Sequence, residues 1–507
     1  MYRVVLTNFK EFSDLGNSYY GSGFAVYAFI LAIATMGIPS TISKLVSEKI
    51  AIGDKKGAHK IFKTALMLFT FIGITFCLLL FFGSEFIANN ILINPGVKYT
   101  LMALSPAIIF VSMTAVIRGY LIGMGNMSEY SKAQVLEQIV NSIFSIIFVV
   151  MLLSRTPEIM AAGSTLATTL ATATSFVYLF LYYNKNKKSI WDDIKNSEKF
   201  SVDSRKKIIK KLISYVIPIS FGSIIVTLSS LIDTVTVVNG LQQFGCTLTE
   251  ANAKFGILVG KVEILNSLPL SINVAFAVAL VPFISSAIAK NNKKEAVNKI
   301  NYSLKISGMI AIPASIGLCL LANRIICLIF PNSPSGADLL QIQAFAVIFS
   351  VIAQTLYGAL QGLGKLYIPG LCLLFGVIVK YILNVIFIPK FGVIVAPIST
   401  LIYQCITCIL AFYLLYKYLK EKPNISNLFL KTIFASLIMG LVIIILNKMY
   451  IYLNLTNNIY TIITIIVAII IYIISIIYLK ILNKEEILQL PMGDKLYSFI
   501  TKYIKNY

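Results

Sequence analysis

Residues 110–125 read FVSMTAVIRGYLIGMG, and residues 349–364 read FSVIAQTLYGALQGLG. Both stretches are apolar runs of helical length that end in glycines. At a constant spacing of 239 residues, Phe110 falls on Phe349, Gly119 on Gly358, Gly123 on Gly362, and Gly125 on Gly364. Self-similarity at a fixed spacing indicates an internal repeat. The sequence therefore predicts two related halves.

Two further matches extend the repeat. The pair Lys55-Lys56 falls on Lys293-Lys294 at a spacing one residue smaller, and Pro39 pairs with Pro282 at a spacing a few residues larger. The repeat contains an even number of apolar runs, so both copies cross the membrane in the same direction. We therefore predict parallel bundles related by an axis along the membrane normal.

The apolar runs themselves identify the class of protein. Hydrophobic residues make up 58% of the 507 residues, charged residues only 13%, and the mean hydropathy is +0.84. A helix needs about 20 apolar residues to cross a bilayer, and the runs lack the alternating polarity of barrel strands. The predicted spans are 17–44, 62–83, 97–120, 133–153, 159–183, 210–236, 252–289, 301–323, 338–361, 366–388, 391–416, 428–447 and 459–481.

Lysine and arginine set the orientation. When the loops are assigned alternately to two sides, one side takes 33 of the 43 basic residues and the other takes 8; Lys261 and Lys380 remain inside spans. The positive-inside rule makes the first side, with the C-terminus, cytoplasmic. The net charge of +22 thus follows membrane topology, and its distribution excludes a nucleic-acid-binding protein.

We predict an all-α polytopic membrane protein with two six-helix bundles, residues 1–200 and 201–425, followed by two extra helices in 426–481. The repeat places the partner of span 210–236 before Met1, so the expected plan has fourteen helices with the first largely missing here. Residues 482–507 carry Leu496, Phe499, Ile500, Tyr503 and Ile504 at helical spacing. This pattern predicts a cytoplasmic amphipathic tail on the anionic membrane surface.

Three motifs resemble a known family. They are Gly37-Ile-Pro39-Ser-Thr-Ile-Ser43-Lys44-Leu-Val-Ser-Glu48, the run Arg118-Gly119 to Gly125 with Gln134-Val-Leu-Glu137-Gln138, and Lys380-Tyr-Ile-Leu-Asn384-Val-Ile-Phe-Ile-Pro389-Lys-Phe-Gly392. In this order they resemble the lipid II flippase and stage V sporulation protein B group of the multidrug/oligosaccharidyl-lipid/polysaccharide exporter superfamily. The resemblance implies two lobes around a central cavity and alternating-access transport of an undecaprenyl-pyrophosphate-linked saccharide. It also implies a groove for the lipid tail along the last two helices.

This sequence departs from that family at its basic positions. The family's arginine pair in helix one is matched only by Arg3, and the pair near the end of helix two becomes Ser43 and Lys44. The helix eight arginine is replaced by Ile264, with Lys261 and Glu263 close by. The saccharide is therefore left open between a lipid II-like cell-wall precursor and a polysaccharide repeat unit.

Ionisable residues inside a membrane span are costly and usually face a cavity. Lys380 lies near the midplane, where it could bind pyrophosphate or form a structural ion pair with Glu263 or Glu137. Lys261 and Glu263 point about 200° apart on a helix and cannot pair together, so we expect at least one to face the cavity. With Arg3, Lys44 and Glu48, these residues are the candidate substrate-binding set, and the roles of Lys44 and Glu48 rest mainly on the resemblance.

Three residues are candidates for gating or coupling. Arg118 borders the glycine-rich turn and could gate access or anchor at the headgroups. Glu137 lies inside the following span. Asp233 is the lone acid late in its helix, where it could bind a coupling Na⁺ or H⁺ or cap the outer helix end.

The predicted function is a flippase for a lipid-linked oligosaccharide in a bacterial cytoplasmic membrane, acting as a monomer among membrane lipids and without a cofactor. The alternative is a cation-coupled multidrug exporter of the same superfamily. An enzyme is not expected, because a membrane glycosyltransferase would need an acidic metal cluster or a sizeable extramembrane domain. The only histidine, His59, falls in a predicted lysine-rich loop, so the sequence offers few residues for zinc binding or a catalytic triad.

Overall fold

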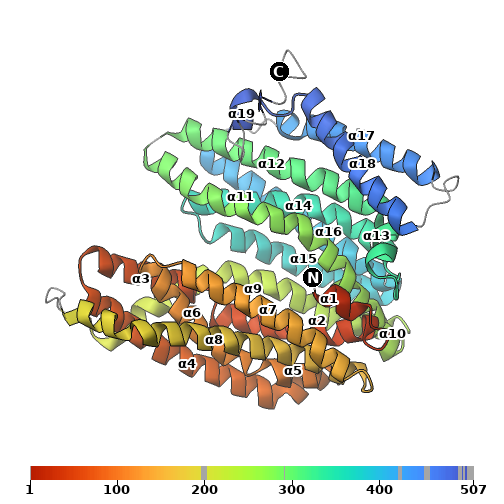
Figure 1. Cartoon of the computed structure of the whole chain (residues 1–507). Coiled ribbons are helices and arrows are strands. Elements are labelled where there is room, and N and C mark those ends of the chain that lie inside the picture. Colours follow the sequence, from red (N-terminus) through yellow and green to blue (C-terminus); the bar gives the residue numbers. More distant parts are fainter. Residues whose placement is uncertain are drawn as a thin grey trace. The chain divides into compact units, whose positions relative to one another are not determined.

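The computed structural model describes residues 2–195, 203–290, 292–420, 425–449 and 457–488, with 494, 497 and 498. Every regular element among these residues is a helix (Figure 1). This confirms the predicted all-α class. Residues 489–493, 495, 496 and 499–507 lie outside the described residues, and so does most of the predicted amphipathic tail.

The chain divides into two compact units, and each is described by itself. Unit 1 comprises residues 1–260 with 381–393, and unit 2 comprises residues 261–380 with 394–507. These units are defined by contacts, and contacts do not show which helices move together as one bundle. The predicted bundle boundary at residue 200 therefore stays a prediction.

Unit 1 contains these helices: α1 (Tyr2–Thr7), α2 (Ser13–Ala34), α3 (Ile38–Ala51), α4 (Lys55–Phe86), the π-turn η1 (Ile87–Ile91), α5 (Val97–Leu104), α6 (Ala107–Gly123), α7 (Ser128–Met151), α8 (Pro157–Lys195), α9 (Arg205–Gln243) and α10 (Leu248–Ile257). Unit 2 contains α11 (Glu263–Ala289), α12 (Lys293–Leu320), α13 (Ala322–Ile329), α14 (Ala337–Gly362), α16 (Val395–Leu419), α17 (Ile425–Met449), α18 (Asn457–Tyr478) and α19 (Lys484–Leu488). The π-turn η2 (Leu258–Val262), α15 (Ile368–Phe391) and the 3₁₀ turn η3 (Gly392–Ile394) contain the points where the chain passes between units.

The predicted spans match the long helices. Among the described residues, twelve helical segments are long and apolar enough to cross a membrane. Eleven correspond to one predicted span each. The twelfth, residues 368–419, covers the two predicted spans 366–388 and 391–416, because η3 joins α15 to α16 without a loop.

Local sequence explains where several helices begin. The Asp54 carboxylate accepts the Gly57 N–H at 2.7 Å and caps α4. Thr247 and Glu250 form a reciprocal capping box at the start of α10. Each side chain satisfies backbone N–H groups that have no partner in the first helical turn.

The repeated glycines serve the same purpose in each unit. A Cβ on Gly119 would lie 2.8 Å from the Pro39 carbonyl oxygen, and a Cβ on Gly358 would lie 2.5 Å from the Ala277 carbonyl oxygen. Glycine therefore allows α6 to touch α3 in unit 1 and α14 to touch α11 in unit 2. Gly125 and Gly364 both have positive φ, +81° and +75°, which ends the helix in a conformation that favours glycine. These matched roles agree with the predicted repeat.

A close polar contact joins α2 to α10 inside unit 1. The Asn252 Oδ1 atom accepts hydrogen bonds from Ser18 Oγ at 2.7 Å and Asn94 Nδ2 at 2.6 Å, and all three side chains are buried. Next to this network, a Cβ on Gly256 would lie 1.7 Å from the Asp14 carbonyl oxygen. The two helices thus meet backbone to backbone at this level.

The last two spans pack on the rest of unit 2 through α12 and α13. Pro313 lies inside α12 and cannot donate to the Met309 carbonyl, four residues earlier. The Tyr472 hydroxyl of α18 donates to that carbonyl at 2.8 Å instead. Beyond the C-terminal end of α18, Glu486 of α19 forms an ion pair with Lys305 of α12 at 2.7 Å. The helix pair is therefore fastened at more than one level.

Candidate functional site

A polar pocket lies inside unit 1 between α2, α6, α7 and α8. Its volume is about 240 Å³. Arg118, Tyr130, Gln134 and Glu137 line one part of it, and Thr35, Thr114 and Thr172 add hydroxyl groups. The remaining wall is apolar: Leu31, Met36, Pro39, Val111 and Ala115. The pocket brings together two of the predicted gating or coupling residues, Arg118 and Glu137.

The charged groups of this pocket are held by their neighbours. The Arg118 guanidinium lies over the Tyr130 ring, 3.9 Å from its centroid. Ser175 and Arg118 both lie near enough to act electrostatically on the Glu137 carboxylate. No ion pair within 4 Å joins Arg118 to Glu137 among the described residues. The two opposite charges therefore share the pocket without closing on each other.

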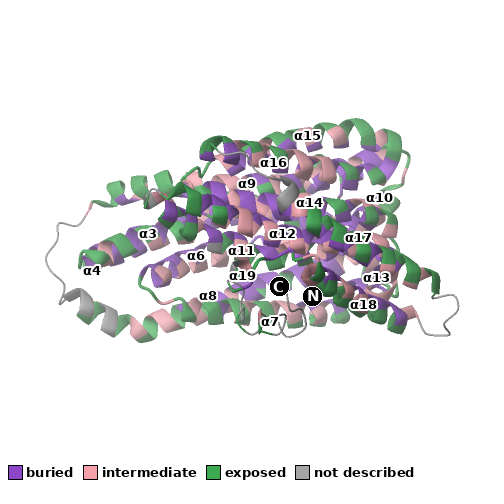
Figure 2. Ribbon diagram, turned by 90° about the horizontal axis from the view of Figure 1, so that it is seen from above, coloured by how far each residue is buried: buried purple, intermediate pink, exposed green. Residues whose placement is uncertain are grey.

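An open groove on α7 adjoins this pocket. The groove has a volume of about 650 Å³ and is lined by Ser131, Gln134, Val135, Gln138, Ile139, Ser142 and Ile143. Gln134 lines both spaces. Buried and exposed residues alternate around the helices (Figure 2), and this face of α7 is largely exposed within unit 1. Polar side chains in a membrane span usually face protein or a water-filled cavity. The groove is thus a largely apolar surface that carries several polar side chains of α7, and it meets the pocket at Gln134.

Lys44 and Glu48 lie elsewhere, at the charged end of α3. Both side chains are exposed, and the Lys44 ammonium lies over the Tyr215 ring, 4.3 Å from its centroid. Glu48 lines a smaller cavity of about 190 Å³ together with Lys49, Asp203 and Lys211.

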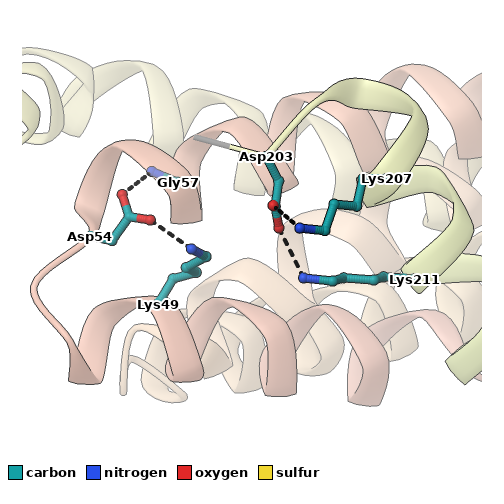
Figure 3. Close-up of polar contacts among 6 residues, drawn as sticks. All are labelled: Lys49, Asp54, Gly57, Asp203, Lys207 and Lys211. Carbon is teal, nitrogen blue, oxygen red and sulfur yellow. Dashed lines mark hydrogen bonds and ion pairs between the residues drawn. The ribbon is translucent and has the colours of Figure 1, made fainter. Parts of the chain in front are cut away.

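Ion pairs organise this region (Figure 3). Lys49 pairs with Asp54 at 2.8 Å, and Asp203 accepts from Lys207 at 2.8 Å and from Lys211 at 2.9 Å. Hydrogen bonds from the two lysines lower the pKa of Asp203 to about 2, so this carboxylate stays charged at any physiological pH. The site is a charged surface at one end of unit 1, separate from the polar pocket.

Asp233 belongs to a third cluster, also in unit 1. The Asn384 amide donates to Asp233 Oδ1 and to Thr236 Oγ1, each at 3.0 Å. Asn384 is fully buried, and Asp233 is nearly so. Because the amide turns its nitrogen toward this cluster, the oxygen atoms that the cluster offers are those of the Asp233 carboxylate and the Thr236 hydroxyl, the type of ligand that hard cations prefer. Asp233 therefore lies in a buried polar cluster of two helices, α9 and α15.

Arg3 contacts the break between α10 and α11. Its guanidinium donates to the Val259 carbonyl at 3.0 Å and lies over the Tyr20 ring, 4.7 Å from the centroid. Val259 lies in η2, and a π-turn disturbs the regular helical hydrogen bonds. Arg3 is therefore held by unit 1 itself.

Lys261 is the most firmly held of the predicted substrate-binding residues. Its ammonium donates to the Ser333 carbonyl at 2.6 Å, to Ser333 Oγ at 2.7 Å and to Ser335 Oγ at 3.0 Å. The side chain has no exposed surface. Glu263, two residues later, is half-buried. Through these hydrogen bonds, Lys261 holds the loop between α13 and α14 in place.

Lys380 is also buried, with 3% of its surface exposed, and its ammonium lies 5.7 Å from the centroid of the Tyr403 ring. The prediction that Lys380, Lys44 and one of Lys261 or Glu263 converge on one cavity involves both units and stays a prediction.

Sequence reasoning missed several residues of these sites. Thr114, Tyr130 and Thr172 line the pocket without forming any motif, since each comes from a different helix. Asn384 was noted within a family-like motif but not as a partner of Asp233. His59 does not lie in a loop, as predicted, but in the first turns of α4, where it is buried among Phe62, Tyr120, Tyr183 and Trp191. The correction has a simple cause: the capped α4 begins at Lys55, before the apolar run.

Long apolar helices that enclose polar pockets and buried charged groups define a polytopic membrane transporter. Residues 2–287 match the family described as polysaccharide biosynthesis protein, which is more than half of the chain, and the chain belongs to this family. Residues 261–386 match the MatE family. Both matches confirm the resemblance to the multidrug/oligosaccharidyl-lipid/polysaccharide exporter superfamily.

Individual proteins agree with this assignment. The chain is 28% identical over 386 residues to the lipid II flippase MurJ of Bacillus subtilis, covering 73% of this chain and 71% of the relative. It is 27% identical over 323 residues to the stage V sporulation protein B of the same organism, covering 64% and 59%.

Solved structures share the fold. A multidrug resistance MATE family transporter in an inward-facing conformation superposes with a TM-score of 0.69 at 16% identity, covering 82% of this chain and 94% of the other. A lipid II flippase MurJ in an inward closed conformation gives 0.59 at 19% identity, covering 93% and 96%.

Proposed function

We propose that the chain is a flippase that carries a polyprenyl-pyrophosphate-linked saccharide from the cytoplasmic to the outer leaflet by alternating access, as a monomer with its C-terminus in the cytoplasm. The observation that carries the proposal is the pocket of unit 1 with its polar and charged side chains, next to a largely apolar groove along α7. The pocket contains three threonines, a glutamine and both signs of charge, all contributed by membrane spans. Polar groups in a span are costly, so we do not expect them in a pocket for apolar drugs.

The relatives support the same choice. The matched family is described by polysaccharide biosynthesis, and one similar relative is a lipid II flippase. The competing proposal, cation-coupled multidrug export, is favoured by the MATE fold and by the match of residues 261–386.

The Asp233–Asn384–Thr236 cluster is our candidate for the coupling site. A buried carboxylate beside a hydroxyl oxygen can bind Na⁺ or hold a proton. Coupling to Na⁺ predicts that transport follows an imposed sodium gradient and that Asp233→Asn abolishes this dependence. If transport responds to neither a sodium gradient nor a pH gradient, the cluster is not a coupling site.

Reconstitution decides between the two functions. Purified full-length chain in liposomes should make a fluorescent undecaprenyl-pyrophosphate disaccharide of the inner leaflet accessible to an outside reagent, at a rate well above that of empty vesicles. The same vesicles should show no gradient-driven extrusion of cationic dyes. Dye extrusion without lipid translocation would establish the exporter instead.

A further inference from the structure

We infer that the pocket of unit 1 lined by Arg118 and Glu137 binds one uncharged sugar ring of the cargo, and that the pyrophosphate binds elsewhere. The inference rests on the proposed function and assigns a ligand to this pocket. It is carried by three properties of the pocket: its charge, its hydrogen-bonding groups and its size.

The charges of the lining cancel. Arg118 and Glu137 are the only charged side chains among the lining residues, and they carry opposite signs. A pyrophosphate brings about two negative charges, and the Glu137 carboxylate would oppose it in a space of low dielectric constant. A cationic drug would meet the same difficulty from Arg118. A neutral ligand with many polar groups meets neither.

The hydrogen-bonding groups suit hydroxyl groups. Arg118 Nε and Thr114 Oγ1 are buried polar atoms of the lining for which no hydrogen-bond partner is found. Buried polar groups in folded proteins are normally hydrogen-bonded, so these two atoms are available to a ligand or to water. Glu137 adds a carboxylate acceptor, and Gln134 can both donate and accept. A sugar hydroxyl donates and accepts at the same atom, so it can satisfy each of these groups.

The shape of the lining suits a ring. The apolar part, which includes Leu31, Met36 and Val111, would contact the C–H face of a pyranose, while the polar part meets its hydroxyl rim. Its volume of about 240 Å³ lies just below the range of about 300–1,000 Å³ for drug-sized ligands and suits one hexose ring. A second ring of the cargo would extend into the groove past Gln134.

Ligand-observed NMR on the full-length chain in nanodiscs tests the inference. The probes are the methyl glycosides of glucose, galactose and N-acetylglucosamine, with inorganic pyrophosphate as the contrasting ligand. At least one glycoside should show saturation transfer at millimolar concentration, and pyrophosphate should not displace it. Glu137→Gln and Thr114→Val should each weaken this binding, the first by about tenfold, the loss expected for one hydrogen bond to a charged group.

Matched controls come from the same unit. Glu85→Gln changes an exposed glutamate and Thr75→Val an exposed threonine, both on α4 and away from the pocket, and both should leave glycoside binding unchanged. The inference is overturned if no glycoside binds at up to about 50 mM, if pyrophosphate competes with the glycosides, or if the two pocket variants bind like the wild type.

Failure of this inference can be told apart from failure of the proposed function. Lipid translocation with wild-type rates in Glu137→Gln would refute the sugar site and keep the flippase. Glycoside binding that depends on Glu137, without lipid translocation, would keep the sugar site and refute the flippase.

Discussion

Two buried lysines of unit 2 give separate predictions. Lys261 donates three hydrogen bonds to Ser333 and Ser335. Lys261→Met should lower the free energy of unfolding by about 2 kcal/mol, because the loop groups lose a charged donor. Thermal unfolding in detergent measures this loss, and Lys448→Met, at an exposed lysine, is the control. Normal stability with abolished transport would show that Lys261 acts on the cargo.

Lys380 gives the second of these predictions. Its ammonium lies beside the Tyr403 ring near the middle of a span, where a lysine costs about 2.5–3.5 kcal/mol on insertion scales. Such a cost suggests a role in transport. Lys380→Met keeps the volume and removes the charge, and it should abolish complementation of a flippase-depleted strain at an unchanged protein level. If the variant protein disappears from the membrane, the lysine is structural.

The sequence could identify these lysines but could not separate their roles. Both are single charges in apolar runs, and this signal is local. The partners of Lys261 lie 72 and 74 residues away in a loop that carries no motif. The same holds for Asp233, whose amide partner Asn384 is 151 residues away. Tertiary packing determines such long-range partners, and the periodicity of apolar residues in a sequence does not reveal them.

At the scale of elements, the contact between α2 and α10 depends on Gly256. Because a Cβ there would lie 1.7 Å from the Asp14 carbonyl oxygen, Gly256→Ala should force the helices apart and cost about 1–3 kcal/mol. Gly222→Ala in α9 is the control, since nothing lies within 4 Å of its Cβ, and it should be neutral or stabilising by up to about 1 kcal/mol. Equal unfolding midpoints for the two variants would contradict the packing argument.

The docking of α18 on α12 predicts a coupled pair. Tyr472→Phe removes the donor to the Met309 carbonyl and should cost about 1 kcal/mol, within the range of polar contacts between membrane helices. Pro313→Ala restores a backbone N–H that can reach the same carbonyl. Tyr472→Phe should then cost less in the Pro313→Ala background. A double-mutant cycle of unfolding free energies measures the coupling, and strict additivity would exclude it.

At the scale of the whole molecule, apolar runs and loop charges were sufficient to predict the helices. Their positions follow from the length needed to cross a bilayer, which is a property of single segments. The missed detail at 368–419 has a local cause: Gly392, with φ +75°, lets α16 follow α15 almost directly. The apolar runs could not predict that residues 201–260 pack with unit 1, because this depends on contacts between distant segments.

The two helices beyond the repeat give a prediction for the whole chain. Since α17 and α18 pack on the outside of α12 and α13, removing residues 425–507 should leave the other spans inserted and folded. We expect the truncated chain to lose transport of a polyprenyl-linked substrate, because the predicted lipid groove is lost. Membrane fractionation and the liposome assay test both parts, and retained transport would show that the groove is dispensable.

The length of α8 has a mechanical consequence. At 1.5 Å per residue, its 39 residues form a rod of about 58 Å, whereas a bilayer with its headgroups is about 40–45 Å thick. One end of the rod must therefore project into water. A 10° swing about the other end would carry the projecting tip through about 10 Å. Spectroscopic labels near this tip would therefore report small rearrangements at the opposite membrane face as large, easily measured displacements.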